Sequence, residues 1–132
     1  MIPKFSVWDK VDKVYDVPIQ IDIDDSGHIS CVDTYHGSLV DGDFVLEQYT
    51  GLKDVNGKKI FEGDIVISGW NEMQEGGPDL YIEAKGQVTF DEGCFGVYDN
   101  EQGFRPLFTM TLNKLHVVGN IHENPELLEV DE

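Results

Sequence analysis

One stretch does most to decide the fold of this 132-residue chain: Gln48-Tyr-Thr-Gly-Leu-Lys-Asp-Val-Asn-Gly-Lys-Lys-Ile-Phe-Glu-Gly-Asp-Ile-Val66. Asn56-Gly57 is a strong turn signal, because both residue types accept a positive φ. Gly51 and Gly63 mark further predicted turns on either side, and residues 64–67 begin a predicted strand. This stretch therefore predicts short strands joined by glycine turns.

Alternating segments continue towards the N-terminus. Residues 3–8 and 18–24 alternate apolar and polar side chains, the period of a half-buried strand. The second segment places Ile19, Ile21 and Ile23 on one face. After a turn at Asp25-Ser26-Gly27 the chain returns as a strand, which predicts a hairpin. Residues 44–49 form either another short strand or a helical turn.

The same pattern extends towards the C-terminus. Residues 80–90 alternate around Gly86, where a bulge or bend would let one long strand curl. Asp91-Glu92-Gly93 is a predicted turn into a second hairpin strand, residues 94–98. The Gly/Pro-rich segment 71–79 is a predicted loop.

Two further strands and a helical turn are expected near the end of the chain. Residues 104–108 form a short strand that Pro106 keeps at an edge, and residues 112–121 form the last strand. Asn124 before Pro125 predicts an N-cap and one short helical turn. Leu127 and Leu128 would pack that turn on the body of the protein.

These elements predict a mainly β protein, built as a small barrel or sandwich. Fourteen glycines support many turns, and Val, Ile, Phe and Tyr dominate the apolar positions. The composition shifts near Tyr49, from an Asp-rich hairpin to Gly- and Lys-rich turns. We therefore divide the chain into residues 1–47, an N-terminal β subdomain, and residues 48–132.

The charge is strongly acidic. There are 26 acidic and 9 basic residues, a net charge of -17, spread along the whole chain. Such a surface repels nucleic-acid phosphates and anionic membranes, so neither is an expected partner. Solubility is the plain interpretation of the charge. The alternative is a mimic of DNA that offers carboxylates to a cationic protein.

Targeting signals are not evident. The N-terminal sequence MIPKFSVWDK has no apolar segment of a secretory signal, and no run of about 18 apolar residues predicts a membrane span. Cys31 and Cys94 lie far apart in the sequence and are expected to be reduced and buried. We therefore expect a cytoplasmic protein.

Four segments, taken together and in this order, resemble the YopX family of phage and prophage proteins. They are residues 4–9 (Lys-Phe-Ser-Val-Trp-Asp), the stretch 48–66 quoted above, residues 90–97 (Phe-Asp-Glu-Gly-Cys-Phe-Gly-Val) and residues 118–127 (Val-Gly-Asn-Ile-His-Glu-Asn-Pro-Glu-Leu). The resemblance implies a phage origin, a role in the cytoplasm of the infected host, and a small SH3-like barrel after about Gln48 with an appended N-terminal β-hairpin subdomain. It implies no activity and no catalytic residues.

One acidic segment has the spacing of a calcium loop. Asp22, Asp24 and Asp33 fall at the first, third and twelfth positions of an EF-hand pattern, with Ser26 and Gly27 between them. However, Asp33 replaces the usual glutamate, and the flanks are predicted strands where the motif requires helices. The favoured interpretation is a plain Asp-Ser-Gly hairpin, and calcium is the alternative.

Zinc would require ligands from distant segments. His28, Cys31 and His36 lack a fourth ligand nearby, and His116 and His122 stand apart from them. Surface or interface histidines are the favoured interpretation. Acidic pairs such as Asp24-Asp25 and Asp91-Glu92 are expected by chance at this acid content, and no nucleophile, phosphate-loop or dinucleotide motif is present. We therefore predict no catalytic, cofactor-binding or metal-binding residues and no enzymatic activity.

The aromatic residues around the second hairpin are a further candidate binding site. Phe90, Phe95, Tyr98 and Phe104 occur at strand spacing and lack basic neighbours. Core packing is therefore favoured over stacking on bases or binding a peptide. The expected function is that of an accessory interaction module, with an unidentified host or phage protein as its partner. Self-association is left open, since edge strands invite it and like charge opposes it.

Overall fold

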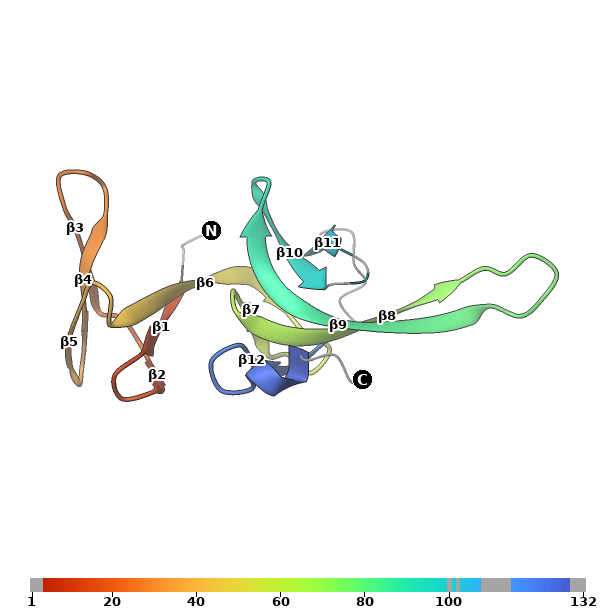
Figure 1. The fold of residues 1–132 in the computed structure, drawn as a ribbon, viewed down its shortest axis with the longest axis horizontal. Coiled ribbons are helices and arrows are strands. Elements are labelled where there is room, and N and C mark those ends of the chain that lie inside the picture. The colour runs from red at the N-terminus through yellow and green to blue at the C-terminus, as the bar shows by residue number, and fades with distance from the viewer. Residues whose placement is uncertain (1–3, 100, 102, 108–114, 129–132) are drawn as a thin grey trace. The chain divides into compact units, whose positions relative to one another are not determined.

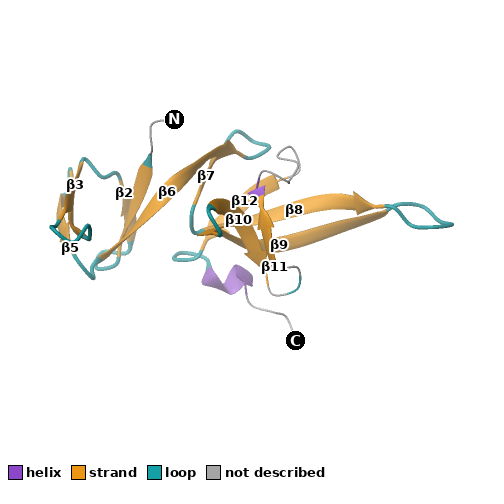
Figure 2. Cartoon of the chain, turned by 90° about the horizontal axis from the view of Figure 1, so that it is seen from above, coloured by secondary structure: helices purple, strands orange, loops and turns teal. Residues whose placement is uncertain are grey.

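The computed structural model describes residues 4–99, 101, 103–107 and 115–128. The strands up to the middle of the chain are β1 (Phe5–Asp9), β2 (Val14–Asp16), β3 (Gln20–Ile23), β4 (Ile29–Thr34), β5 (Gly37–Val40) and β6 (Phe44–Lys53). The later elements are β7 (Lys59–Phe61), β8 (Asp64–Glu72), β9 (Leu80–Asp91), β10 (Cys94–Asp99), β11 (Gly103–Pro106), β12 (Leu115–Asn120) and the 3-10 helix η3 (Pro125–Leu128). The fold is mainly β, as the sequence predicted (Figures 1 and 2).

The chain forms two compact units, Met1–Tyr49 and Thr50–Glu132. In unit 1, β1 is central and pairs antiparallel with both β2 and the first part of β6. A separate three-stranded sheet has the order β3-β4-β5. Unit 1 therefore contains more strands than the expected hairpin, because the short strands β2 and β5 are also part of it.

The interior of unit 1 combines apolar and polar groups. Val7 and Val32 are fully buried, and the ring of Trp8 meets that of Tyr15 edge-on, with centroids 4.9 Å apart. The Tyr15 hydroxyl donates a hydrogen bond of 2.8 Å to the buried carboxylate of Glu47. A buried carboxylate is tolerated where a donor of this kind reaches it.

The β3–β4 hairpin is confirmed, with Ile21 opposite Val32. Its apolar face is only partly covered, since the side chains of Ile19 and Ile23 are 51% and 66% exposed. Alternation therefore predicted the strand correctly but overstated how much of that face is buried.

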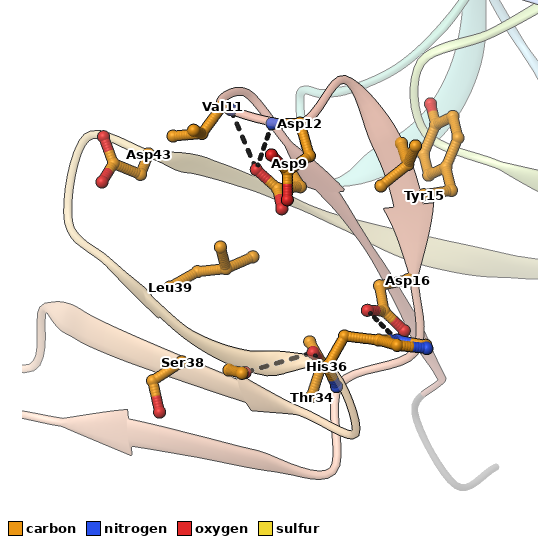
Figure 3. Close-up of a pocket in the computed structure, with 12 residues that line it drawn as sticks. Asp9, Val11, Asp12, Tyr15, Asp16, Thr34, His36, Ser38, Leu39 and Asp43 are labelled. Carbon is orange, nitrogen blue, oxygen red and sulfur yellow. Dashed lines mark hydrogen bonds and ion pairs between the residues drawn. The ribbon is translucent and has the colours of Figure 1, made fainter.

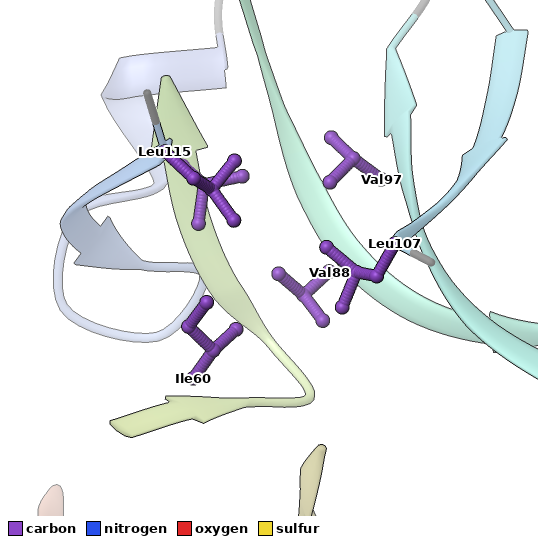
Figure 4. Close-up of a cluster of buried hydrophobic side chains, with 6 residues drawn as sticks. Ile60, Val88, Val97, Leu107 and Leu115 are labelled. Carbon is purple, nitrogen blue, oxygen red and sulfur yellow. The ribbon is translucent and has the colours of Figure 1, made fainter. Parts of the chain in front are cut away.

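Unit 2 is built on a curled five-stranded antiparallel sheet of order β11-β10-β9-β8-β12, which forms a half-barrel. The predicted β9–β10 hairpin and the edge position of β11 are confirmed. Six buried side chains form its core, as Figure 4 shows: Ile60, Val66, Val88, Val97, Leu107 and Leu115. The SH3-like closure of this sheet stays a prediction.

Gly86 makes the curl of β9 sterically feasible. A Cβ at this position would lie 2.6 Å from both the carbonyl oxygen of Tyr98 and Cγ1 of Val97. Only a residue without a side chain allows β10 to approach β9 this closely. The bend predicted at Gly86 thus has its cause in the neighbouring strand.

The C-terminal helical turn is confirmed as η3, and Leu127 and Leu128 are half-buried. The Asn124 side chain has a different role from the expected cap: its Oδ1 accepts the N–H of Asn120 at 3.3 Å. Gly119 leaves room for it, since a Cβ there would lie 2.6 Å from that oxygen. Within the described part of the chain, no helix has the length and hydrophobicity of a membrane span.

Candidate functional site

A concave site lies within unit 1, between the turn that follows β1 and the β4–β5 hairpin (Figure 3). The cavity has a volume of about 660 Å³. Its lining residues are Asp9, Val11, Asp12, Val14, Tyr15, Asp16, Thr34, His36, Gly37, Ser38, Leu39 and Asp43. This volume falls in the range of pockets that hold small ligands or single side chains.

The first wall is shaped by the carboxylate of Asp9. Its Oδ1 accepts the backbone N–H groups of Val11 at 2.9 Å and Asp12 at 3.0 Å. An aspartate side chain that accepts hydrogen bonds from the backbone two and three residues later in the sequence closes a tight turn. This turn presents Val11 and Val14, which are 65% and 50% exposed, beside the cavity.

The second wall is the turn between β4 and β5. Thr34 Oγ1 accepts the N–H of His36 and donates to the carbonyl oxygen of Gly37, both at 3.1 Å. Leu39 follows on β5 and adds an apolar surface. Asp43 closes the end of the cavity, where its carbonyl oxygen accepts the N–H of Lys10 at 2.9 Å.

A hydrogen bond between two side chains joins the two walls. His36 Nδ1 lies 2.9 Å from Oδ2 of Asp16 on β2. The hydrogen bond from His36, followed by one from the N–H of Val17, holds the pKa of Asp16 below its usual value. Asp16 is therefore ionised at neutral pH.

The lining favours a ligand that is both cationic and apolar. It holds four aspartates and one histidine, and no lysine or arginine. The carboxylates of Asp12, Asp16 and Asp43 suit an ammonium or guanidinium group. The valines and Leu39 suit an alkyl stem, and lysine and arginine side chains combine these two features.

Comparison with known proteins identifies the family. The sequence matches the family model described as YopX protein over residues 4–129. The chain belongs to the YopX family. The resemblance seen in the sequence is thus confirmed, and no curated protein matches this member of the family.

Two solved structures are similar to this YopX-family chain. Protein EF1440 from Enterococcus faecalis has a TM-score of 0.69 and 28% sequence identity, with 98% of this chain and 99% of that chain covered. Protein yopX from Bacillus subtilis has a TM-score of 0.60 and 21% identity, with 97% of each chain covered. At the lower identity the likeness supports the fold alone.

The residues that carry the YopX resemblance have structural roles. Thr50 Oγ1 donates to the carbonyl oxygen of Ile60 at 2.8 Å, which ties β6 to β7. Gly57 has a φ of 80°, as the Asn-Gly turn requires. Asp64 Oδ2 accepts the N–H of Phe61 at 2.9 Å and closes the turn into β8.

The residues of the calcium pattern form the β3–β4 hairpin and its turn. Asp24 Oδ1 accepts hydrogen bonds from the Ser26 N–H and hydroxyl and from the His28 N–H, at 2.7 to 3.0 Å. Asp22 and Asp33 lie on the paired strands β3 and β4. This carboxylate is therefore engaged in shaping the turn.

The zinc candidates are held apart by other contacts. His28 Nε2 lies 2.9 Å from Oδ2 of Asp41, and His36 lies against Asp16. Cys31 is a free, half-buried thiol, and desolvation followed by Asp33 raises its pKa. Within the described residues, no three His, Cys, Asp or Glu side chains form a group that could hold a metal ion.

Core packing was the wrong expectation for two of the four aromatics. Phe95 packs partly against the core of unit 2, but Phe90 and Tyr98 are 55% and 50% exposed. Tyr98 follows the buried Val97 on β10 and so points to the opposite face. The rings of Phe90 and Phe95 meet edge-on, with centroids 5.0 Å apart.

Of the cavity residues, only His36 was a site candidate in the sequence, and for a different ligand. Asp9, Asp12 and Asp16 carry no local signal that sets them apart from the other acidic residues of this chain. They meet Leu39 and Asp43 only because β1 pairs with β6 and the β4–β5 hairpin folds beside them. No local pattern carries that information.

Proposed function

We propose that this YopX-family protein is a phage-encoded, non-enzymatic interaction module in the host cytoplasm, and that its unit 1 cavity binds a lysine or arginine side chain of a partner protein. The supporting observation is the composition of the cavity wall: four aspartates and three apolar side chains around about 660 Å³. The net charge of -17 would draw a basic partner towards this surface.

The geometry accounts for how such a side chain would be held. The stem would lie along Val11, Val14 and Leu39, and the cationic head would replace water at Asp12 and Asp43. Asp16 contributes less, because its Oδ2 is already engaged by the ring of His36. A guanidinium has the advantage over an ammonium, since its planar fork can bridge two carboxylates.

A matched pair of small probes tests the proposal. N-acetyl-arginine amide and its neutral isostere N-acetyl-citrulline amide are titrated while the methyl resonances of Val11, Val14 and Leu39 are followed by NMR. We expect the arginine probe to shift these methyls with a Kd on the order of millimolar, because a single side chain makes few contacts. The citrulline probe should leave them unchanged.

Charge neutralisation supplies the second arm of the experiment. Asp12→Asn with Asp43→Asn should weaken arginine binding about tenfold. The control, Asp25→Asn with Glu92→Gln, removes the same charge from exposed turns and should have little effect. Equal binding of the two probes, or equal losses in the two variants, would contradict the proposal.

A second candidate function is a mimic of DNA that occupies a cationic DNA-binding protein. The observation in its favour is the acidic excess, which is spread over the chain rather than gathered at the cavity. Its affinity for a partner should fall steeply with salt and respond to acids anywhere on the surface. A partner affinity that does not change with salt concentration would contradict the DNA-mimic function. An affinity that falls only in the cavity variant would favour the side-chain-binding function.

A further inference from the structure

A two-stranded arm extends beyond the sheet of unit 2. Among the residues that the structure describes, the last pair of β12 with β8 is Leu115↔Ser68, and the last pair of β10 with β9 is Tyr98↔Gln87. The pairing of β8 with β9 continues from Gly69↔Glu83 to Glu72↔Leu80. We define residues 69–83 as the arm, which Figure 1 shows as the long ribbon ending in a loop.

The arm displays apolar side chains to solvent. Met73 is 89% exposed, Leu80 53% and Tyr81 51%. The ring of Tyr81 lies across Gly69, so closely that a Cβ there would overlap its hydroxyl oxygen. Laying an aromatic ring over a cross-strand glycine fixes the ring in one place. Tyr81 is therefore a preset apolar surface and not a freely rotating side chain.

The charge of the arm is of one sign. Residues 69–83 contain Glu72, Glu75, Asp79 and Glu83, and no lysine, arginine or histidine. A second copy of this chain would bring an equally acidic arm against this one, and like charges brought opposite each other disfavour self-pairing. A basic segment would find complementary charge there.

The outer edge of β9 is suited to strand addition. Along Leu80–Glu83, no strand of the described residues other than β8 pairs with it. Leu80, Tyr81 and Glu83 are all exposed. An edge with uncovered side chains offers backbone donors and acceptors to an incoming strand, and the side chains set which sequence is accepted.

We propose that the β9 edge of the arm binds an extended segment of a partner protein in which lysine or arginine alternates with apolar residues, added as a third strand. The apolar side chains of this segment would pack beside Leu80 on one face of the added strand, and its cations would lie on the other face, beside Tyr81 and Glu83 and near Asp79. This surface belongs to unit 2 and does not rest on the unit 1 cavity.

A synthetic peptide in which lysine alternates with valine over about eight residues, the length of an ordinary strand, serves as the probe. Its binding to the full chain is measured by fluorescence anisotropy, and protection of the arm amides by hydrogen exchange. The variant Glu75→Gln, Asp79→Asn and Glu83→Gln should weaken binding about tenfold. The matched control, Glu92→Gln, Glu101→Gln and Glu126→Gln, changes net charge equally and should bind as the parent does.

A second peptide separates strand addition from mere charge attraction. Methylating alternate backbone nitrogens removes the donors that an added strand needs but keeps every lysine. We expect this peptide to lose binding and protection at Leu80–Glu83. Equal binding of both peptides, equal losses in the two variants, or protection elsewhere would overturn the proposal, as would a peptide-independent dimer formed through the arm. The cavity variant Asp12→Asn with Asp43→Asn should leave peptide binding intact, so the two proposals fail separately.

Discussion

Asp54 Oδ2 accepts the backbone N–H of Val117 at 3.0 Å, across 63 residues of sequence. The other oxygen of this buried carboxylate accepts the N–H groups of Asn56 and Lys58, both at 2.9 Å. One side chain thus closes the Asn-Gly turn and fastens it to β12. This explains why an aspartate stands before that turn in the stretch that decides the fold.

Replacing Asp54 by alanine should destabilise the protein by about 2–4 kcal/mol, because three backbone N–H groups lose a shared acceptor that is itself buried. Urea unfolding followed by circular dichroism measures the change. Asp25→Ala, an exposed turn aspartate, is the control and should cost less than about 1 kcal/mol. A loss of stability of similar size in both variants would show that the hydrogen bonds of Asp54 to the turn and to β12 do not stabilise the fold specifically.

The contribution of Asp54 should also depend on pH. Desolvation alone would raise its pKa, but the hydrogen bonds from Val117, Lys58 and Asn56 outweigh it and hold the pKa below 3.8. A carboxyl whose pKa is lower in the folded state stabilises above its unfolded pKa and loses that contribution as pH falls through the folded value. The stability gap between parent and Asp54→Ala should therefore be constant from pH 7 to 5 and narrow below pH 3.8. A gap that is unchanged at pH 3 would contradict this.

Asp64 should have the opposite pH dependence. Its burial raises its pKa to about 6. The folded state then binds the proton more tightly than the unfolded state, so this group stabilises below its ordinary pKa of 3.8 and loses that contribution as pH rises through about 6. Asp64→Asn keeps an acceptor for the Phe61 N–H and should be more stable than the parent by about 1–2 kcal/mol at pH 7.5. The free energies of unfolding of the two proteins, measured by thermal or urea unfolding, should become equal near pH 4. His28, whose pKa the hydrogen bond to Asp41 raises, titrates in both proteins, so the difference between them isolates Asp64.

Gly86→Ala should destabilise unit 2 by about 1–3 kcal/mol, since the added Cβ would meet the Tyr98 carbonyl and the Val97 side chain. Gly77→Ala is the matched control, because a Cβ there has nothing within 4 Å. Denaturant midpoints of the two variants give the comparison. If both variants unfold alike, close approach of β10 is not the reason for glycine at this position.

Local sequence determined the elements whose causes lie within a few residues. Alternation and turn residues were enough to predict β1, the β3–β4 and β9–β10 hairpins and the helical turn at Pro125, because each depends on neighbours along the chain. The three- and four-residue strands β2, β5 and β7 were not predicted, since segments so short show too little alternation and form by pairing with longer strands.

Tertiary structure decided what lies side by side. The cavity brings Asp12 of one turn to Leu39 of another hairpin, and Asp54 reaches Val117, because strand pairing joins segments that no local pattern relates. The exposure of Phe90 and Tyr98 was likewise settled by which face of the sheet the core covers. Spacing along a strand tells which side chains share a face, but only packing against the rest of the fold buries that face.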